Sequence, residues 1–360
     1  MSVASRRERP VDRGVTLALG AAILFGLSTP LAKGLLTAAT PQLLAGLLYV
    51  GSGVGLGFVF LTRRQRDHAE APLSRRDVPW LAGAIAAGGV AGPLLLLTGL
   101  ARTPASSASL LLSLEGVLTA GLAWFVFHEN VDRRVALGVV AILAGGLVLS
   151  WQGRISITGL TGPLLIAGAC LCWAIDNNLT QKVSAGDPVQ IAMIKGLIAG
   201  TVNLSIALRM GAVWPSAPVV LGAFALGFFS YGVSLVLFVL ALRRIGTART
   251  GAYFSTAPFV GAAAALLFWR EPVTPWLAVG GALMGLGVWL HVTEWHEHEH
   301  VHEALEHEHM HVHDAHHQHT HGPGNHSPES LDEAHSHLHR HEPLVHTHPH
   351  YPDIHHRHRS

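Results

Sequence analysis

The stretches FVFHENV (Phe125–Val131) and LFWREPV (Leu267–Val273) hold corresponding places in the two halves of the chain. Around them, residues 100–150 align with residues 242–292 without a gap, so that glutamate falls on glutamate and valine on valine. Each stretch closes one apolar segment and leads into a second that is apolar and rich in glycine. A duplicated membrane unit is the usual architecture of a secondary transporter. The repeat therefore predicts both the fold and the class of the protein.

The composition of this 360-residue chain is that of a membrane protein. Charged residues make up 13% of it and the mean hydropathy is +0.37, whereas a soluble domain carries about 25% charged residues. A formal net charge of +1 argues against nucleic acid as a partner. No nucleotide-binding or hydrolase motif occurs in the sequence, so we expect a protein that is not an enzyme and requires no cofactor.

Ten segments are apolar and long enough to cross a bilayer, which takes about 20 residues per helix. The predicted spans are residues 14–37, 41–62, 77–101, 104–127, 131–152, 159–182, 187–209, 217–242, 248–269 and 273–293. We predict an all-α integral membrane protein of two five-helix repeats and a tail. The domains would be an N-terminus at 1–13, repeats at 14–152 and 159–293, and a disordered His-rich tail at 294–360.

Arginine and lysine predict the orientation of these spans. They gather before the first span, between the second and third, after the fourth and sixth, and between the eighth and ninth. The positive-inside rule then places both termini in the cytoplasm, with the chain in the cell (inner) membrane. Five spans per half is an odd number, so the second repeat must be inverted relative to the first.

A further pair of motifs connects the repeat to a known family. The stretch TAPFVGA at 256–262, followed by FWREP at 268–272, is similar to the signature near the end of the ninth helix in EamA-type members of the drug/metabolite transporter superfamily. The resemblance covers roughly residues 14–293 and is specific for the fold. It is weak for the substrate, because members are described for amino acids, metabolites, sugars and toxic compounds. The signature residues that it implies, interpreted as mainly architectural, are Glu129, Glu271 and Pro258.

Polar residues inside the predicted spans are the candidates for a transport pathway. A charge at the centre of a bilayer costs about 2.5–3.5 kcal/mol on insertion scales, so it is rarely accidental. We expect a substrate or ion pathway lined by Lys33, Glu115, Asp176, Asn177, Asn178, Lys195, Tyr253 and Thr256.

Asp176 is the first candidate among these residues. It follows Cys172 by four positions and so shares a helix face with it. With Glu115 across a cavity, these groups could hold a cation or exchange a proton. The alternative is a structural hydrogen-bond network between helices, worth about 0.6 kcal/mol per contact. Lys195 could likewise pair with Asp176 or Glu115 instead of contacting substrate.

The C-terminal tail has a different character from the rest of the chain. All histidines except His68 and His128 lie at or beyond His291, mostly in an alternating His-x-His pattern. Few apolar residues follow Trp295, so we expect a largely disordered tail, with at most a helical stretch at 296–313. Neutral imidazole binds divalent Zn, Ni, Co or Cu. The predicted metal ligands are His296, His298, His300, His302, His307, His309, His311, His313, His316, His317, His319 and His321. The alternative is a solubilising or pH-responsive extension.

These features predict a secondary active transporter, most simply an exporter, of a small metabolite or drug-like solute. It would work by alternating access, driven by a proton or other ion gradient, with Asp176 and Glu115 titrating in each cycle and a metal-binding regulatory tail. Two alternatives stay open. One is a transporter of a divalent metal ion or metal chelate, and the other is a non-transporting membrane protein that stores or presents metal. Membrane lipid would be a partner, and a homodimer is compatible with the sequence.

Overall fold

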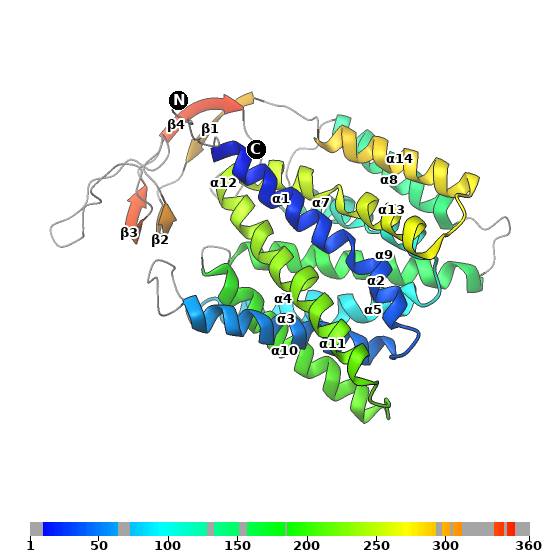
Figure 1. The fold of residues 1–360 in the computed structure, drawn as a ribbon. Helices are drawn as coiled ribbons and strands as arrows, with labels where there is room; N and C mark the ends of the chain where they lie inside the picture. The colour runs from blue at the N-terminus through cyan, green and yellow to red at the C-terminus, as the bar shows by residue number, and fades with distance from the viewer. Residues whose placement is uncertain are drawn as a thin grey trace, which may run out of the picture.

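The computed structural model describes residues 10–63, 73–127, 133–150, 157–183 and 186–292, together with 297–302, 305–311, 335–341 and 344–349. The described residues form α-helices, two π-helical segments and four short strands (Figure 1). The first half contains α1 (Pro10–Gly26), α2 (Ser28–Leu35), α3 (Pro41–Arg63), α4 (Val78–Ala84), η1 (Ile85–Ala91), α5 (Gly92–Leu100), α6 (Ala105–Leu111), α7 (Leu114–Phe127) and α8 (Arg133–Ser150). The second half contains α9 (Ile157–Gln181), α10 (Pro188–Arg209), α11 (Ala217–Leu226), η2 (Gly227–Val233), α12 (Ser234–Phe254), α13 (Ala257–Trp269) and α14 (Pro275–Val292).

Several of these helices, singly or joined end to end, have the length and composition of membrane spans, in which the backbone satisfies its own hydrogen bonds. Six helical stretches are long and apolar enough to cross a bilayer: Arg13–Leu35, Pro41–Thr62, Val78–Leu100, Gly159–Thr180, Pro188–Arg209 and Ala217–Ala241. Four shorter apolar helices accompany them in the described part of the chain: Ala105–Thr119, Ala136–Ser150, Ala257–Trp269 and Pro275–Leu290. The chain is therefore a helical, multi-pass membrane protein.

An irregularity of the backbone recurs in both halves. The π-helical segment η1 starts at residue 85 and ends at residue 91, and η2 starts at 227 and ends at 233. The shift of 142 residues at both ends is the shift that places Glu129 on Glu271. A π-helical segment is rare and is often found at functional sites. Its recurrence at one register means that the two halves share local backbone structure as well as sequence.

Helices pack through glycine, which lets membrane helices approach closely. The closely packed pairs are α3 with α10, α8 with α14, α1 with α12, and α5 with α9 (Figure 1). On α3, Gly46 lies against Leu204 of α10, and Gly57 lies against Met193. Because the partner number falls as the α3 number rises, these two helices run antiparallel. In the same way Gly145 of α8 lies against Met284, and Gly287 of α14 against Ile142.

The tail differs from the disorder and the helical stretch at 296–313 that we expected. The structure describes four strands there: β1 (Glu297–His302), β2 (Leu305–His311), β3 (His335–His341) and β4 (Leu344–Pro349). Strand β1 pairs with β4 and β2 with β3, both antiparallel. The prediction was wrong for these segments because a strict His-x-His alternation has the period of two that is typical of a strand, not the 3.6 of a helix.

Candidate functional site

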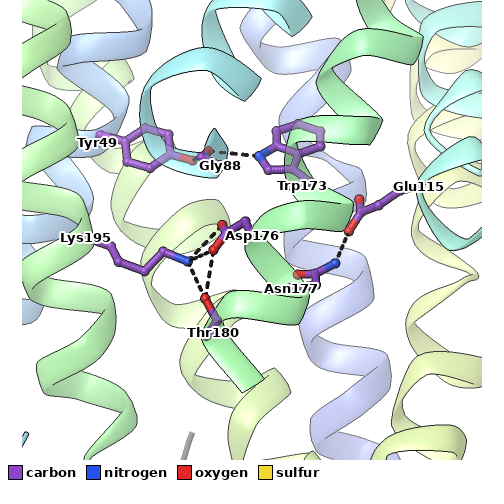
Figure 2. A network of polar contacts seen from close by, with 8 residues as sticks. All are labelled: Tyr49, Gly88, Glu115, Trp173, Asp176, Asn177, Thr180 and Lys195. Atoms are coloured by element: carbon purple, nitrogen blue, oxygen red, sulfur yellow. Dashed lines mark hydrogen bonds and ion pairs between the residues drawn. The ribbon is translucent and has the colours of Figure 1, made fainter. Parts of the chain in front are cut away.

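A buried ion pair between neighbouring helices forms the centre of the site (Figure 2). Lys195 Nζ donates to both carboxylate oxygens of Asp176, at 2.6 Å and 2.8 Å, and to Thr180 Oγ1 at 3.1 Å. Thr180, one turn after Asp176 on α9, in turn donates to Asp176 Oδ1 at 2.8 Å. Of the partners that we considered for Lys195, the structure therefore selects Asp176.

The start of α10 sets the position of Lys195. Pro188 opens the helix, and the side chain of Asp187 accepts the Val189 N–H at 2.8 Å, which caps it. Lys195 then lies two turns into the helix, where only 7% of its surface is exposed, and Asp176 is 8% exposed. Taking both charges out of water is expensive, and leaving either one without the other costs more. The two side chains are therefore strongly interdependent.

The backbone of η1 joins the two helices of this pair to α3. The carbonyl oxygen of Gly88 accepts the Tyr49 hydroxyl at 2.9 Å and the Trp173 indole N–H at 3.0 Å. The next carbonyl, of Gly89, accepts the side-chain amide of Asn203 at 3.0 Å. A Cβ at Gly88 would overlap the carboxylate of Asp176. Glycine at this position therefore lets the Asp176 carboxylate lie directly against the π-helical backbone.

Glu115 lies on the other side of α9 (Figure 2). It occupies the first turn of α7, immediately after the turn at Leu112 and Ser113, and is half-buried. Its Oε1 accepts the side-chain amide of Asn177 at 2.8 Å. Because Asp176 and Asn177 are consecutive on α9, they extend toward Lys195 and toward Glu115 respectively. The structure thus brings together four of the residues that the sequence singled out.

Three of the remaining predicted pathway residues, Asn178, Thr256 and Lys33, hydrogen-bond to backbone carbonyl groups instead. Asn178 donates to the carbonyl of Ala174 on its own helix, at 2.8 Å, and Thr256 donates to the carbonyl of Tyr253 at 2.7 Å. Lys33 donates to the carbonyls of Leu100 and Thr103, at the C-terminal end of α5. Among the contacts described for residues 10–292, none places Lys33, Tyr253 or Thr256 on the Asp176–Lys195 pair.

The signature residues of the repeats lie at helix ends. Glu271 accepts the backbone N–H groups of Ala105 at 2.8 Å and Ser106 at 3.0 Å, and also the Ser106 hydroxyl. A residue of the second repeat thereby caps the first turn of α6 in the first. Pro258 is buried at the second position of α13, where a missing N–H costs little. The corresponding Glu129 lies outside the described residues.

Three aromatic residues near the ion pair, Phe25, Tyr49 and Trp173, were missed from sequence as site residues. Phe25 contacts Trp173 and Tyr231 edge-on, with ring centroids 6.0 Å and 6.1 Å apart, and Tyr49 lies 5.4 Å from Tyr231. From sequence, an aromatic residue in an apolar span cannot be told from one that only fills the core. The sequence signal that was available is the polar atom of Tyr49 and Trp173, since a buried Tyr or Trp usually finds a hydrogen-bond partner.

The described residues bring no metal-ligand cluster together. Among the described residues, no group of three or more His, Cys, Asp or Glu side chains is arranged to hold a metal ion. Cys172, which we had placed with Asp176 and Glu115 as a ligand group, is half-buried and has no disulfide partner among the described residues. Of the tail histidines, His298, His300 and His302 are in β1, and His307, His309 and His311 are in β2. The other predicted ligands, His296, His313, His316, His317, His319 and His321, lie outside the described residues.

Comparison with known proteins decides the family. The sequence profile of the EamA-like transporter family matches residues 12–151 and, a second time, residues 160–293. The chain belongs to the EamA-like transporter family. This confirms the resemblance seen in the TAPFVGA and FWREP stretches, and it agrees with the expectation that the chain is not an enzyme, because the named relatives are transporters.

Two named relatives and one solved structure are similar to this chain. A protein of Methanothermobacter thermautotrophicus named "Uncharacterized transporter" is 31% identical over 75% of this chain and 83% of its own length. The "Threonine/homoserine exporter RhtA" of Escherichia coli strain K12 is 30% identical over 44% of this chain and 54% of its own length. A crystal structure that is 20% identical covers 77% of this chain and 94% of its own, with a TM-score of 0.60, which shows a shared fold.

The interdependence of Asp176 and Lys195 predicts a non-additive mutant cycle. Asp176→Asn and Lys195→Met should each lower the free energy of unfolding by about 3–5 kcal/mol, because each leaves a buried charge unpaired. The double variant should lose much less than the sum of the two, since it removes both charges. Chemical unfolding of the purified variants in detergent measures the difference. Additive losses would contradict the ion pair.

Proposed function

We propose that this EamA-like protein is a secondary active transporter that exports a small solute by alternating access. The observation that carries the proposal is the buried Asp176–Lys195 ion pair, held where α9 and α10 meet η1 in an otherwise apolar bundle. Charged groups at membrane depth are costly and commonly line a transport pathway. The family supports transport, and the name of the Escherichia coli relative, an exporter, favours the outward direction.

The two repeats are proposed to be five-helix units in inverted orientation, ten spans in all. Support comes from two pairs of corresponding helices, α3 with α10 and α8 with α14, which contact one another in antiparallel directions. Corresponding helices of opposite direction are what an inverted repeat produces. Rocking of one repeat against the other would then expose the polar cluster to each side in turn. Both termini would lie in the cytoplasm and the protein in the inner membrane, following the arginine and lysine distribution.

The substrate class we propose is a small polar metabolite that carries both charge signs, such as an amino acid. The site itself offers a carboxylate and an ammonium group in direct contact, and the next residue of α9, Asn177, adds a side-chain amide on the side that faces Glu115. Such a set can bind the ammonium and carboxylate groups of a zwitterion by charge-assisted hydrogen bonds. The printed name of the Escherichia coli relative, which concerns threonine and homoserine, supports the same class.

Flux of labelled threonine into vesicles that contain the pure protein tests this function. Wild-type vesicles should take up threonine faster than empty vesicles. The Asp176→Asn/Lys195→Met variant should be at least about tenfold slower, because losing a buried charge contact costs about 2 kcal/mol or more. Ser205→Ala is the matched control on α10, since the Ser205 hydroxyl bonds only its own helix, at Thr201, and is exposed. Wild-type flux no greater than that of empty vesicles, across a panel of amino acids, would rule out the proposed substrate class.

A second candidate function, metal binding by the tail, is favoured by the strand register. The β1–β4 pairing places His298 opposite His348 and His300 opposite His346. The β2–β3 pairing likewise sets histidine opposite histidine at three positions. Directly opposite residues in an antiparallel pair have their Cβ atoms about 4.5–5.5 Å apart. This repeated juxtaposition of imidazole-bearing residues suits a borderline divalent metal such as Zn²⁺ or Ni²⁺.

A chain stopped after Glu294 separates the two functions. If the tail binds metal for a regulatory purpose, cells with the truncated chain should differ from cells with the full chain in nickel and zinc tolerance and content. Threonine flux in metal-free vesicles should be the same for both proteins. Identical metal tolerance and content in full-length, truncated and gene-deleted cells would overturn the metal role and leave the transport proposal standing.

A further inference from the structure

The carboxylate of Asp176 is fully engaged. Oδ1 accepts Lys195 Nζ at 2.6 Å and Thr180 Oγ1 at 2.8 Å, and Oδ2 accepts Lys195 Nζ at 2.8 Å. Its charge is neutralised by a lysine with which it shares a buried environment. Each oxygen of this carboxylate therefore has a hydrogen-bond donor, and the cation that neutralises it is in direct contact.

Glu115 is held differently. Oε1 accepts one neutral amide, from Asn177 at 2.8 Å. Within the described residues no lysine, arginine or histidine forms an ion pair with Glu115, and Oε2 has no hydrogen bond. An ionised carboxylate without a cation is costly in apolar surroundings, so it tends to take up a proton or another cation.

The groups that face Glu115 do not supply the missing charge. On α9 they are Asp176, already paired, and the thiol Cys170, which lies against the Leu111 carbonyl at 3.7 Å. On α3 the nearby group is the hydroxyl of Tyr49, which donates to Gly88. The part of α8 from Ala136 to Ser150 contains no ionisable residue. Among the residues that the structure describes, Lys195 is the cation of this region, and its ammonium group donates to Asp176 and Thr180.

The second repeat shows that the fold does not need a carboxylate at this place. The shift of 142 residues that superimposes η1 on η2 places Glu115 on Ala257. Ala257 begins α13 as a residue that is 1% exposed, in close contact with Gly26. A small apolar residue thus satisfies the packing in one repeat, while the other has an acid. A requirement of helix packing alone does not account for that acid.

We infer that Glu115 is the proton-exchange site of this transporter, separate from the Asp176–Lys195 pair that is proposed to bind the substrate. The inference rests on the proposed function and replaces the expectation that both carboxylates titrate in each cycle. Oε2 of Glu115 takes a proton from water on one side of the membrane, and the acid is neutral while the repeats rock. The same proton returns to water on the other side, which regenerates the carboxylate, and no other bond forms or breaks.

Dicyclohexylcarbodiimide tests the assignment without any transported solute, because it adds to a protonated carboxyl group in an apolar site and leaves an N-acylurea. The full-length protein in lipid nanodiscs would be treated across a range of pH, and the adducts mapped by mass spectrometry. Glu115 should be labelled, and more slowly as the pH rises. Asp176 should be labelled at least about tenfold more slowly than Glu115, since Lys195 and Thr180 occupy both of its oxygens in a buried pair that is costly to break. In Lys195→Met, Asp176 should become reactive.

A second measurement covers the case in which the reagent does not reach Glu115. The infrared carbonyl-stretch band of a protonated carboxylic acid should appear as the pH is lowered, disappear in Glu115→Gln and persist in Asp176→Asn/Lys195→Met. Glu115→Ala should fold normally, as the Ala257 comparison implies, and should lack the band. Asp176 labelled as fast as Glu115 in the wild type, or a band unchanged in Glu115→Gln, would overturn the inference. If the band behaves as expected but threonine flux is absent, the transport proposal fails and the proton site stands.

Discussion

The close crossing of α3 and α10 is the contact on which the site depends. At its centre a Cβ on Gly196 would lie 2.6 Å from the backbone nitrogen of Gly53, and one on Gly53 would lie 2.5 Å from the nitrogen of Leu197. Two backbones can meet this closely only through glycine. Lys195 directly precedes Gly196, and the carbonyl of Tyr49 lies 2.9 Å from the Cβ position of that same glycine. The crossing therefore brings the lysine of one repeat and the tyrosine of the other to η1 and Asp176.

A nearly symmetric scaffold surrounds an asymmetric set of charges. Lys195 lies seven residues after the proline that opens α10, and Leu48 holds the same place in α3. The stretch at residues 25–30, aligned on 173–178, places Ser28 on Asp176. Ser28 is 1% exposed, and its hydroxyl has no hydrogen-bond partner among the described residues. Both repeats thus build the same helix contacts, but the buried ion pair belongs to the second repeat and the acid Glu115 to the first. The two repeats can therefore rock symmetrically, although the residues that recognise the substrate differ between them.

The sequence was informative where a single residue conflicted with its surroundings. Asp176, Lys195 and Glu115 could be found because charges in apolar spans are rare. Their pairing could not, since Asp176 and Lys195 lie on separate helices and either acid was a plausible partner for the lysine. The π-helical segments have no sequence signature that we could use, although they explain why Gly88 must be glycine. In the tail, composition predicted disorder, while the alternation of histidine carried the period of a strand.

Cysteine cross-linking between α3 and α10 tests most directly whether corresponding helices of the two repeats meet in antiparallel fashion. In a background without Cys170 and Cys172, the variant Gly57→Cys/Met193→Cys should form a disulfide on mild oxidation, because a Cβ at Gly57 lies 3.7 Å from Met193 Sδ. The variant Gly57→Cys/Leu204→Cys should not, since Leu204 contacts Gly46 near the other end of the crossing. A disulfide in the second variant and none in the first would contradict the antiparallel contact, and with it the inverted repeat and the shared polar site.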